Sequence, residues 1–294
     1  TFGRAFWILD DIRPLREIAR TGGKVLEQPF KIFPIPDAYQ AAFKSFEGIR
    51  FSADGMFAGE NKAPGAWITL WAPQAKTTAP AANNVKPAAA KEEKRPERVK
   101  IIILSATGDT VRTFSSRIDT GMVKVYWPLT RNGVRTPSRQ ERRGDEDSAP
   151  SGPQVLPGTY KVVAVWGKFK DSSSVTVKSD PRLNVKLDDL KAKDAAFLDM
   201  EKVVKKATEG FDQLKEARNT IRRVDAALAT APDSTKQRLA KLGKALQDSL
   251  NVLEQLYMEP EDVKGIQRNE NNLSSALQRA QQYMNASDGA PNQG

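Results

Sequence analysis

The side chains of this sequence that could take part in chemistry are carboxylates, lysines and tryptophans, because its 294 residues include no His and no Cys. That composition excludes Ser-His-Asp and Cys-His catalysis, thiolate metal sites, and zinc or copper held by His. Carboxylate chemistry, lysine chemistry, calcium or magnesium held by oxygen, and binding without catalysis remain. The residue types therefore narrow the function mainly by exclusion.

The carboxylates occur in three clusters, and a structural role explains each of them. Asp10 and Asp11 end an apolar run, and neighbours on a strand point to opposite faces, so they do not form the carboxylate pair of a glycosidase. Asp188 and Asp189 open a helix, where the helix dipole favours negative charge. Residues 145–147 (DED) lack the alternating spacing and the Gly of a calcium loop. We predict no catalytic residue, no metal site and no cofactor.

Three tryptophans are the remaining candidates for a ligand-facing surface. Trp67 and Trp71 lie four residues apart in one predicted strand and so share a face, and Trp166 lies in another strand. On an exposed face, indole rings could pack against sugar rings. Aromatic residues at strand spacing are more often core residues, so core packing is favoured and the sugar-facing role is the alternative.

The positive charge is spread along the first two thirds of the chain. The formal net charge is +10, with 30 Lys and Arg against 19 Asp and Glu in residues 1–186, and 16 against 17 in residues 187–294. The densest basic run, residues 131–147, also holds four acids, as solvated loops do. The basic pairs at residues 205–206 and 222–223 lie beside acids and predict solvated helix faces. We therefore expect no nucleic-acid partner. No run of residues approaches the apolar length of a membrane span.

Residues 1–64 begin with a strand and continue as an extended segment. Residues 1–11 alternate and then run apolar into an Asp-Asp turn, and residues 14–18 predict a short helix that Gly22 and Gly23 stop. Residues 28–36 contain three Pro, which cannot donate ladder hydrogen bonds, so they are not a central strand. Because the chain opens within a strand and without Met, we expect it to be a piece of a longer protein.

Residues 65–183 are a series of short strands. Apolar runs at residues 66–71, 98–104, 111–114, 122–127, 159–166 and 172–178 alternate with turn signals, which is typical of an antiparallel β-sandwich of the immunoglobulin (Ig) type. Residues 75–97 are an Ala-, Pro- and Lys-rich tract expected to be a disordered insertion. Residues 131–152 are expected to form a long polar loop.

Residues 184–286 are expected to be helical. Apolar residues at steps of three and four predict one long helix to about residue 230, a second to about Pro260 and a third from Glu261. Short connections between helices produce antiparallel neighbours, so we predict a helical hairpin or three-helix bundle. Residues 287–294 are expected to be a disordered tail. The predicted fold class is thus β plus α in separate domains.

Four motifs in this order resemble the C-terminal part of exported bacterial proteins with a sortilin-like β-propeller (BNR-repeat, "glycosyl hydrolase-like"). Residues 3–11 (GRAFWILDD) resemble the last propeller strand, although Phe2 stands where the family has His. Residues 33–39 (FPIPDAY) resemble the segment that leaves the propeller. Residues 155–160 (VLPGTY) and 179–182 (SDPR) are similar to the family's strand entry and to the joint before its helices.

The resemblance implies that this chain is a non-catalytic structural and interaction region that packs on the propeller and presents a binding surface. It implies an exported protein: periplasmic, cell-surface or secreted. The upstream propeller is the expected partner, together with another exported protein or a polysaccharide. The alternative is a carbohydrate-binding accessory region of a glycosidase or lyase. The resemblance also implies a strand that closes the propeller, with these residues: Gly3, Arg4, Trp7, Asp10 and Asp11.

Overall fold

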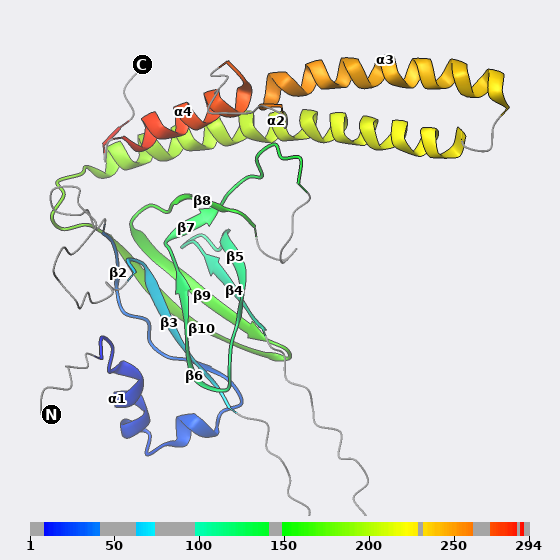
Figure 1. Cartoon of the computed structure of the whole chain (residues 1–294). Helices are drawn as coiled ribbons and strands as arrows, with labels where there is room; N and C mark the ends of the chain where they lie inside the picture. Colours follow the sequence, from blue (N-terminus) through cyan, green and yellow to red (C-terminus); the bar gives the residue numbers. More distant parts are fainter. Residues whose placement is uncertain are drawn as a thin grey trace, which may run out of the picture. The chain divides into compact units, whose positions relative to one another are not determined.

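The computed structural model describes residues 9–41, 63–73, 98–140, 149–228, 232–260, 271–286 and 289–290. The chain divides into two compact units, and both are drawn in Figure 1. The first comprises Thr1–Asn132 and Asp145–Asn184, and the second comprises Gly133–Gly144 and Val185–Gly294. Strands fill the first unit and long helices the second, so the predicted mixture of α and β structure is confirmed. Within the described ranges, no helix combines the length and the apolar character needed to cross a membrane.

The first unit contains two short helical elements and ten strands within the described ranges. The helical elements are α1 (Arg13–Arg20) and the 3-10 helix η1 (Lys24–Glu27). The strands are β1 (Lys31–Ile32), β2 (Ala38–Gln40), β3 (Ala66–Ala72), β4 (Arg98–Leu104), β5 (Thr110–Arg117), β6 (Gly121–Trp127), β7 (Thr130–Asn132), β8 (Ser151–Gln154), β9 (Gly158–Trp166) and β10 (Phe169–Ser179). Each apolar run that predicted a strand in residues 65–183 is part of one of them.

The larger sheet has the order β2-β10-β9-β4-β5. All its strand pairs are antiparallel except β2 with β10, which is parallel. β9 and β10 form a hairpin around residues 167–168, where Gly167 has a φ of 58°, a conformation that Gly adopts without steric cost. β4 and β9 are rich in Val, Ile and Thr, and such β-branched residues fit a pleated, half-buried surface.

The second sheet has the order β1-β3-β6, and the Pro-rich segment supplies β1, one of its two edge strands. Lys31 and Ile32 pair with β3, and the N–H of Phe33 donates to the carbonyl of Thr69 at 3.0 Å. Phe30, Ile32 and Phe33 are buried, as their apolar side chains predict. An edge position suits this segment because only one side of it needs hydrogen-bond donors.

Both of these sheets contribute side chains to one apolar cluster. Alternate residues of each strand point inward, as the two-residue period of a strand requires. The indole of Trp127 is fully buried and meets the ring of Tyr160 edge-on, with the ring centroids 5.7 Å apart. The other strand residues of the cluster are Ile32, Ala38, Ala66, Ile68, Leu70, Ala72, Val99, Ile101, Ile103, Val125, Val162, Ala164, Trp166, Val175 and Val177.

The loop predicted at residues 131–152 begins and ends in two short strands, β7 and β8, which pair with each other. β7 and β8 were not predicted, because their polar residues lack the apolar alternation of a strand. The buried Arg112 guanidinium donates to the carbonyls of Arg131 at 3.0 Å and Pro150 at 2.6 Å, and so joins the two ends of the loop. Burial lowers the pKa of Arg112.

The strand unit ends in a compact turn at the Asp-Pro-Arg joint. The buried Asp180 carboxylate accepts the backbone N–H of Arg182 at 2.9 Å and its guanidinium at 2.5 Å. The hydrogen bond with Asp180 raises the pKa of Arg182. One carboxylate therefore sets the direction in which the chain leaves β10.

The helical unit consists of α2 (Leu187–Ala227), α3 (Asp233–Tyr257), α4 (Leu273–Asn285) and the segment of residues 133–140. α2 confirms the single long helix predicted from the apolar spacing. Pro232 precedes α3 in extended conformation, and the Asn272 side chain caps α4 by accepting the N–H of Ser275 at 2.8 Å. The start predicted for the third helix, at residue 261, lies outside the described residues, as do the predicted insertion at residues 75–97 and most of the predicted tail.

At Gly65 the strand unit has no room for a side chain. Its φ is +150°, and a Cβ there would lie 2.6 Å from both the Trp127 carbonyl oxygen and the Tyr126 ring. We expect Gly65→Ala to lower the free energy of unfolding of the strand unit by about 2–4 kcal/mol, from backbone strain plus overpacking. Urea denaturation followed by tryptophan fluorescence measures this.

Gly121→Ala is the matched control, because Gly121 has a φ of +100° but has open space around its Cα. Gly121→Ala should lower the free energy of unfolding only by the backbone strain, about 1–2 kcal/mol. Equal losses for the two variants would show that crowding against Trp127 and Tyr126 contributes nothing.

Candidate functional site

The N-terminal carboxylates have a local structural role. Asp11 Oδ1 accepts the backbone N–H of Arg13 at 3.0 Å just before α1, which is the turn expected of an Asp-Asp pair, and Asp10 is exposed. Gly3, Arg4 and Trp7 lie outside the described residues.

Trp67 and Trp71 share a half-buried face of β3, as predicted, and their indoles bond within the protein. Trp67 Nε1 donates to the Ala63 carbonyl at 3.2 Å, and its ring lies 5.1 Å from that of Tyr126. Trp71 Nε1 donates to the Leu26 carbonyl at 3.0 Å. Partial burial raises the pKa of Tyr126. These rings hold the segments that precede β1 and β3 against the face of the sheet.

Trp166 is 2% exposed and packs against Phe30 and Phe169, with centroid distances of 5.8 Å and 6.1 Å. Its side chain belongs to the core and does not face a ligand. The structure therefore does not bring the three candidate tryptophans together on one exposed surface.

A cavity of about 390 Å³ in the strand unit holds little unused charge. Its lining includes Asp37 and Arg182, and each of them is already in an ion pair within the protein. Asp37 pairs with Lys178 at 2.5 Å, and this hydrogen bond raises the pKa of Lys178. This cavity therefore offers a charged ligand little that the protein does not already use.

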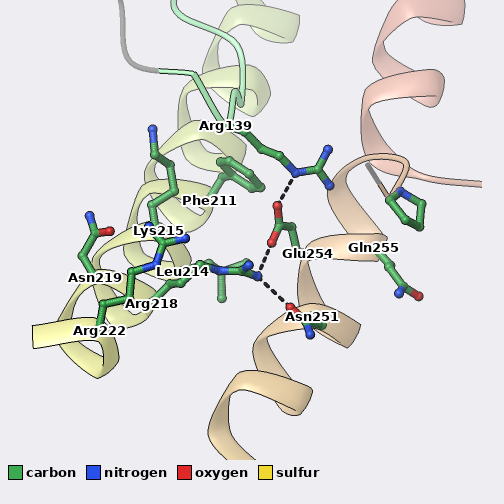
Figure 2. Close-up of a pocket in the computed structure, with 11 residues that line it drawn as sticks. Arg139, Phe211, Leu214, Lys215, Arg218, Asn219, Arg222, Asn251, Glu254 and Gln255 are labelled. Atoms are coloured by element: carbon green, nitrogen blue, oxygen red, sulfur yellow. Dashed lines mark hydrogen bonds and ion pairs between the residues drawn. The ribbon is translucent and has the colours of Figure 1, made fainter. Parts of the chain in front are cut away.

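A polar cleft of about 520 Å³ lies between α2 and α3 in the helical unit (Figure 2). Side chains of α2 line one side, because their steps of three and four residues place them on one helix face. α3 and the segment of residues 133–140 complete the cleft. The lining residues are Arg139, Phe211, Leu214, Lys215, Arg218, Asn219, Arg222, Asn251, Glu254, Gln255 and Pro260.

Glu254 is at the centre of the cleft's hydrogen bonds. Its carboxylate accepts Arg139 Nε at 2.5 Å on one oxygen and pairs with Arg218 on the other. Arg218 also donates to Asn251 Oδ1 at 2.9 Å. The Glu254 side chain is only 13% exposed, so both ion pairs are partly shielded from water and stronger than surface pairs. Figure 2 shows the two guanidinium groups converging on this carboxylate.

The segment of residues 133–140 is fastened to both helices that form the cleft. The Thr208 hydroxyl donates to the Arg135 carbonyl at 2.6 Å, and the Arg135 side chain pairs with Asp212. Arg139 reaches α3 through Glu254, and its guanidinium donates to the Glu259 carbonyl at 2.7 Å. These contacts hold the segment at both of its ends, so Arg139 is pre-positioned at the cleft.

The cleft has an excess of positive charge. Four cations, Arg139, Lys215, Arg218 and Arg222, line it with one carboxylate, Glu254, which makes the lining +3. Lys215 donates to the Ser138 carbonyl at 3.3 Å, and Arg222 forms no ion pair with the side chains that the structure describes. Asparagine and glutamine amides add neutral donors. Such a lining can bind an anion with several oxygens.

A helix floor with apolar contacts keeps the two sides of the cleft close together. Phe211 is buried, and its ring lies 5.5 Å from that of Tyr257. A Cβ on Gly210 would lie 2.6 Å from the Tyr257 hydroxyl, so Gly allows this approach of α3 to α2. The residue spacing of α2 thus places apolar side chains at the bottom of the cleft and cationic side chains around its opening.

The sequence holds a partial signal for this cleft, although its charge pattern predicts only solvated helix faces. Arg222 and Arg223 are adjacent, yet Arg223 pairs with Glu216 on the exposed surface whereas Arg222 lines the cleft. The steps from Phe211 to Arg218 and Arg222 mark one helix face. Arg139 is distant in sequence, and no local pattern connects it to α3.

Neither a scan against protein-family models nor a search of curated proteins found a match to this chain. Among the described residues, no group of three or more Asp or Glu side chains is placed to hold a metal ion.

Glu254→Gln tests whether the two ion pairs stabilise the helical unit. The substitution keeps the shape but removes the charge, so Arg139 and Arg218 would repel each other across the cleft. We expect a loss of about 1–3 kcal/mol in the free energy of unfolding, measured by urea denaturation followed by circular dichroism at 222 nm.

Glu216→Gln is the control, because the Glu216–Arg223 pair lies on the same unit with both side chains about two-thirds exposed. Its loss should stay within about 0.5 kcal/mol. If both variants lose the same stability, Glu254 is not the organising group of the cleft.

Proposed function

We propose that this chain is a non-catalytic structural and interaction region, and that the cleft between α2 and α3 binds an acidic segment of a partner protein. The observation that carries the proposal is the charge of the lining, four cations against one carboxylate. The positive charge of the helical unit is concentrated in this cleft, because the charges of the rest of the unit nearly cancel. The cleft can therefore attract anions although the whole surface is not basic.

A carboxylate is the anion that these groups suit best. Arg139 and Arg218 already form ion pairs with the Glu254 carboxylate. The guanidinium groups of the cleft therefore have a geometry that fits carboxylate oxygens. Lys215 and Arg222 are the cations that Glu254 leaves available. The apolar floor at Phe211 and Leu214 would contact the methylene groups of an acidic side chain or a neighbouring apolar residue.

A nucleic acid is a poorer fit to this cleft. Binding along a phosphate backbone needs a stripe of cations that neutralises many successive charges. Here two cations are available in a pocket that also holds a carboxylate. A short acidic peptide segment needs only two or three such contacts.

An oligoglutamate peptide is the probe for this proposal. We expect it to bind the chain with an affinity that falls as salt is raised, and Lys215→Glu with Arg222→Glu to weaken binding by about tenfold or more. Fluorescence anisotropy of the labelled peptide measures both effects. An oligolysine peptide should not bind at the same concentration.

Lys205→Glu with Lys206→Glu is the matched control, because it makes the same charge change at exposed positions of the same helix. It should leave binding within about threefold of the parent chain. Equal losses in the two double variants would mean attraction to net charge alone, and the cleft would then have no special role.

For the strand unit we propose the finer architecture of an Ig-like β-sandwich. Tyr160 lies at the start of β9, and its hydroxyl donates to the Leu156 carbonyl at 2.6 Å, four residues upstream. A tyrosine bonded back to its own loop in this way is a feature of Ig domains, as is a buried tryptophan, here Trp127, packed in the core.

For the helices we propose an antiparallel bundle, since α2 and α3 meet along one face.

We further propose that the chain packs on a sortilin-like β-propeller of the same exported protein. The support is the resemblance of residues 3–11, 33–39, 155–160 and 179–182 to that family. If this is right, the propeller expressed separately will co-elute with this chain from a sizing column. Separate elution of two folded proteins at concentrations far above micromolar would contradict it.

A further inference from the structure

Alternate residues of the five-stranded sheet point away from the core and form its outer face. Val99, Val162 and Val175 belong to the core cluster, so the residues beside them in β4, β9 and β10 face outward. Residues paired across strands share a face, which extends this assignment to β5. We call this outer face the basic sheet face, because it carries these cations: Arg98, Lys100, Arg117, Lys161, Lys170 and Lys178.

No acidic residue of the five strands faces outward beside these cations. Asp171 is the one acid within the strands, and it lies on the inner side, where it accepts a backbone N–H of β1 at 2.8 Å. Lys178, at one end of the face, pairs with Asp37 just before β2. Lys161 and Lys170 are exposed, and neither forms an ion pair with the side chains in the described ranges. The centre of the face therefore holds positive charge that the strands do not balance.

The strand register spaces the lysines widely over the face. Lys100 of β4 and Lys170 of β10 both lie opposite Val165 of β9, one on each side of it. Neighbouring strands are about 4.8 Å apart, so the backbones of these two lysines are about 10 Å apart. Lys161 lies four residues from Val165 along β9, which is about 13 Å, and is opposite Ser174 of β10. The cations thus form a spaced array across three strands.

Hydroxyl groups occupy positions between the lysines. Ser172 and Ser174 of β10 are exposed, and so is Thr159 of β9. A hydroxyl both donates and accepts hydrogen bonds, so these side chains suit a ligand that itself carries hydroxyl groups. The aliphatic side chains of Ile102 and Val165 are only half-buried, and they lie flat among the polar groups. The face offers charge and hydrogen bonds with little fully exposed apolar surface.

We propose that the basic sheet face binds an anionic polysaccharide of the polyuronate class. The carboxylates along such a chain would pair with the spaced lysines, and the sugar hydroxyls between them would bond with the Ser and Thr side chains. Charge complementarity therefore selects the ligand, and the flat sheet leaves room for an extended chain. This proposal concerns the strand unit and does not depend on the ligand of the cleft.

Two other polyanionic surfaces suit this face less well. A single-stranded nucleic acid gains much of its affinity from bases that stack on aromatic side chains, and the outward positions of β4, β5, β9 and β10 hold none. Tyr39, on the edge strand β2, is a single ring beside Lys178. A membrane surface favours exposed large apolar side chains that can insert, and those same four strands present none on this face.

Fluorescence anisotropy of a labelled oligogalacturonate tests the proposal on the full chain. We expect binding that weakens as salt is raised, and Lys161→Glu with Lys170→Glu to weaken it by about tenfold or more. Unlabelled polygalacturonate should displace the probe, whereas neutral dextran should not. A parent chain that fails to bind the probe at low salt overturns the proposal.

Lys24→Glu with Lys124→Glu is the matched control, because it makes the same charge change at exposed positions of η1 and of the second sheet. It should leave binding within about threefold of the parent chain. The cleft variant, Lys215→Glu with Arg222→Glu, should behave in the same way. Equal losses in all three double variants would mean attraction to net charge alone and would overturn the assignment to this face.

A gain of affinity tests the face without any risk to the fold. Ser172→Lys with Ser174→Lys adds two cations at exposed positions of β10 and should tighten binding of the oligogalacturonate about threefold or more. A single-stranded oligonucleotide with the same number of negative charges should bind the parent chain at least about tenfold more weakly. Equal affinity for the two probes would show that the face accepts any polyanion, which would overturn the polysaccharide as its ligand.

Discussion

The arrangement of the helical unit depends on one carboxylate shared by two guanidinium groups. Glu254 of α3 is held by Arg218 from α2 and by Arg139 from the segment of residues 133–140, so three separate parts of the chain meet at its two oxygens. The carboxylate is mostly shielded from water, which strengthens both pairs but also makes removal of either partner costly. Around it, the remaining cations of the cleft lining have no equivalent anion. The interaction that organises the unit therefore also creates the cleft.

The strand unit has a different organising principle, which is the burial of alternate apolar side chains from two sheets. Its polar side chains fasten loops to that core: Arg112 joins the ends of the loop after β7, and Asp180 shapes the joint after β10. The tryptophans act in the same way, because the indole N–H groups of Trp67 and Trp71 bond to backbone carbonyls. In this unit, the residues that the sequence suggested for ligand binding hold the chain together.

The proposed function follows from the chemistry of the cleft. Lys215 and Arg222 offer charge and hydrogen-bond donors to an acidic segment, and Phe211 and Leu214 lie beside them as an apolar floor. Under this proposal the helical unit presents a surface for assembly with a partner protein.

The local sequence determined the elements of this protein, because strand and helix periods, Pro and Gly act within a few residues of one another. β3, β4, β9 and the full length of α2 follow from such patterns, and so does the absence of His- and Cys-based chemistry. Only the tertiary structure decided the cleft, because Arg139 lies 115 residues from Glu254 and no local period connects them. It also decided that Trp166 is core and Arg222 lines a site, since burial depends on what packs against a residue from elsewhere in the chain.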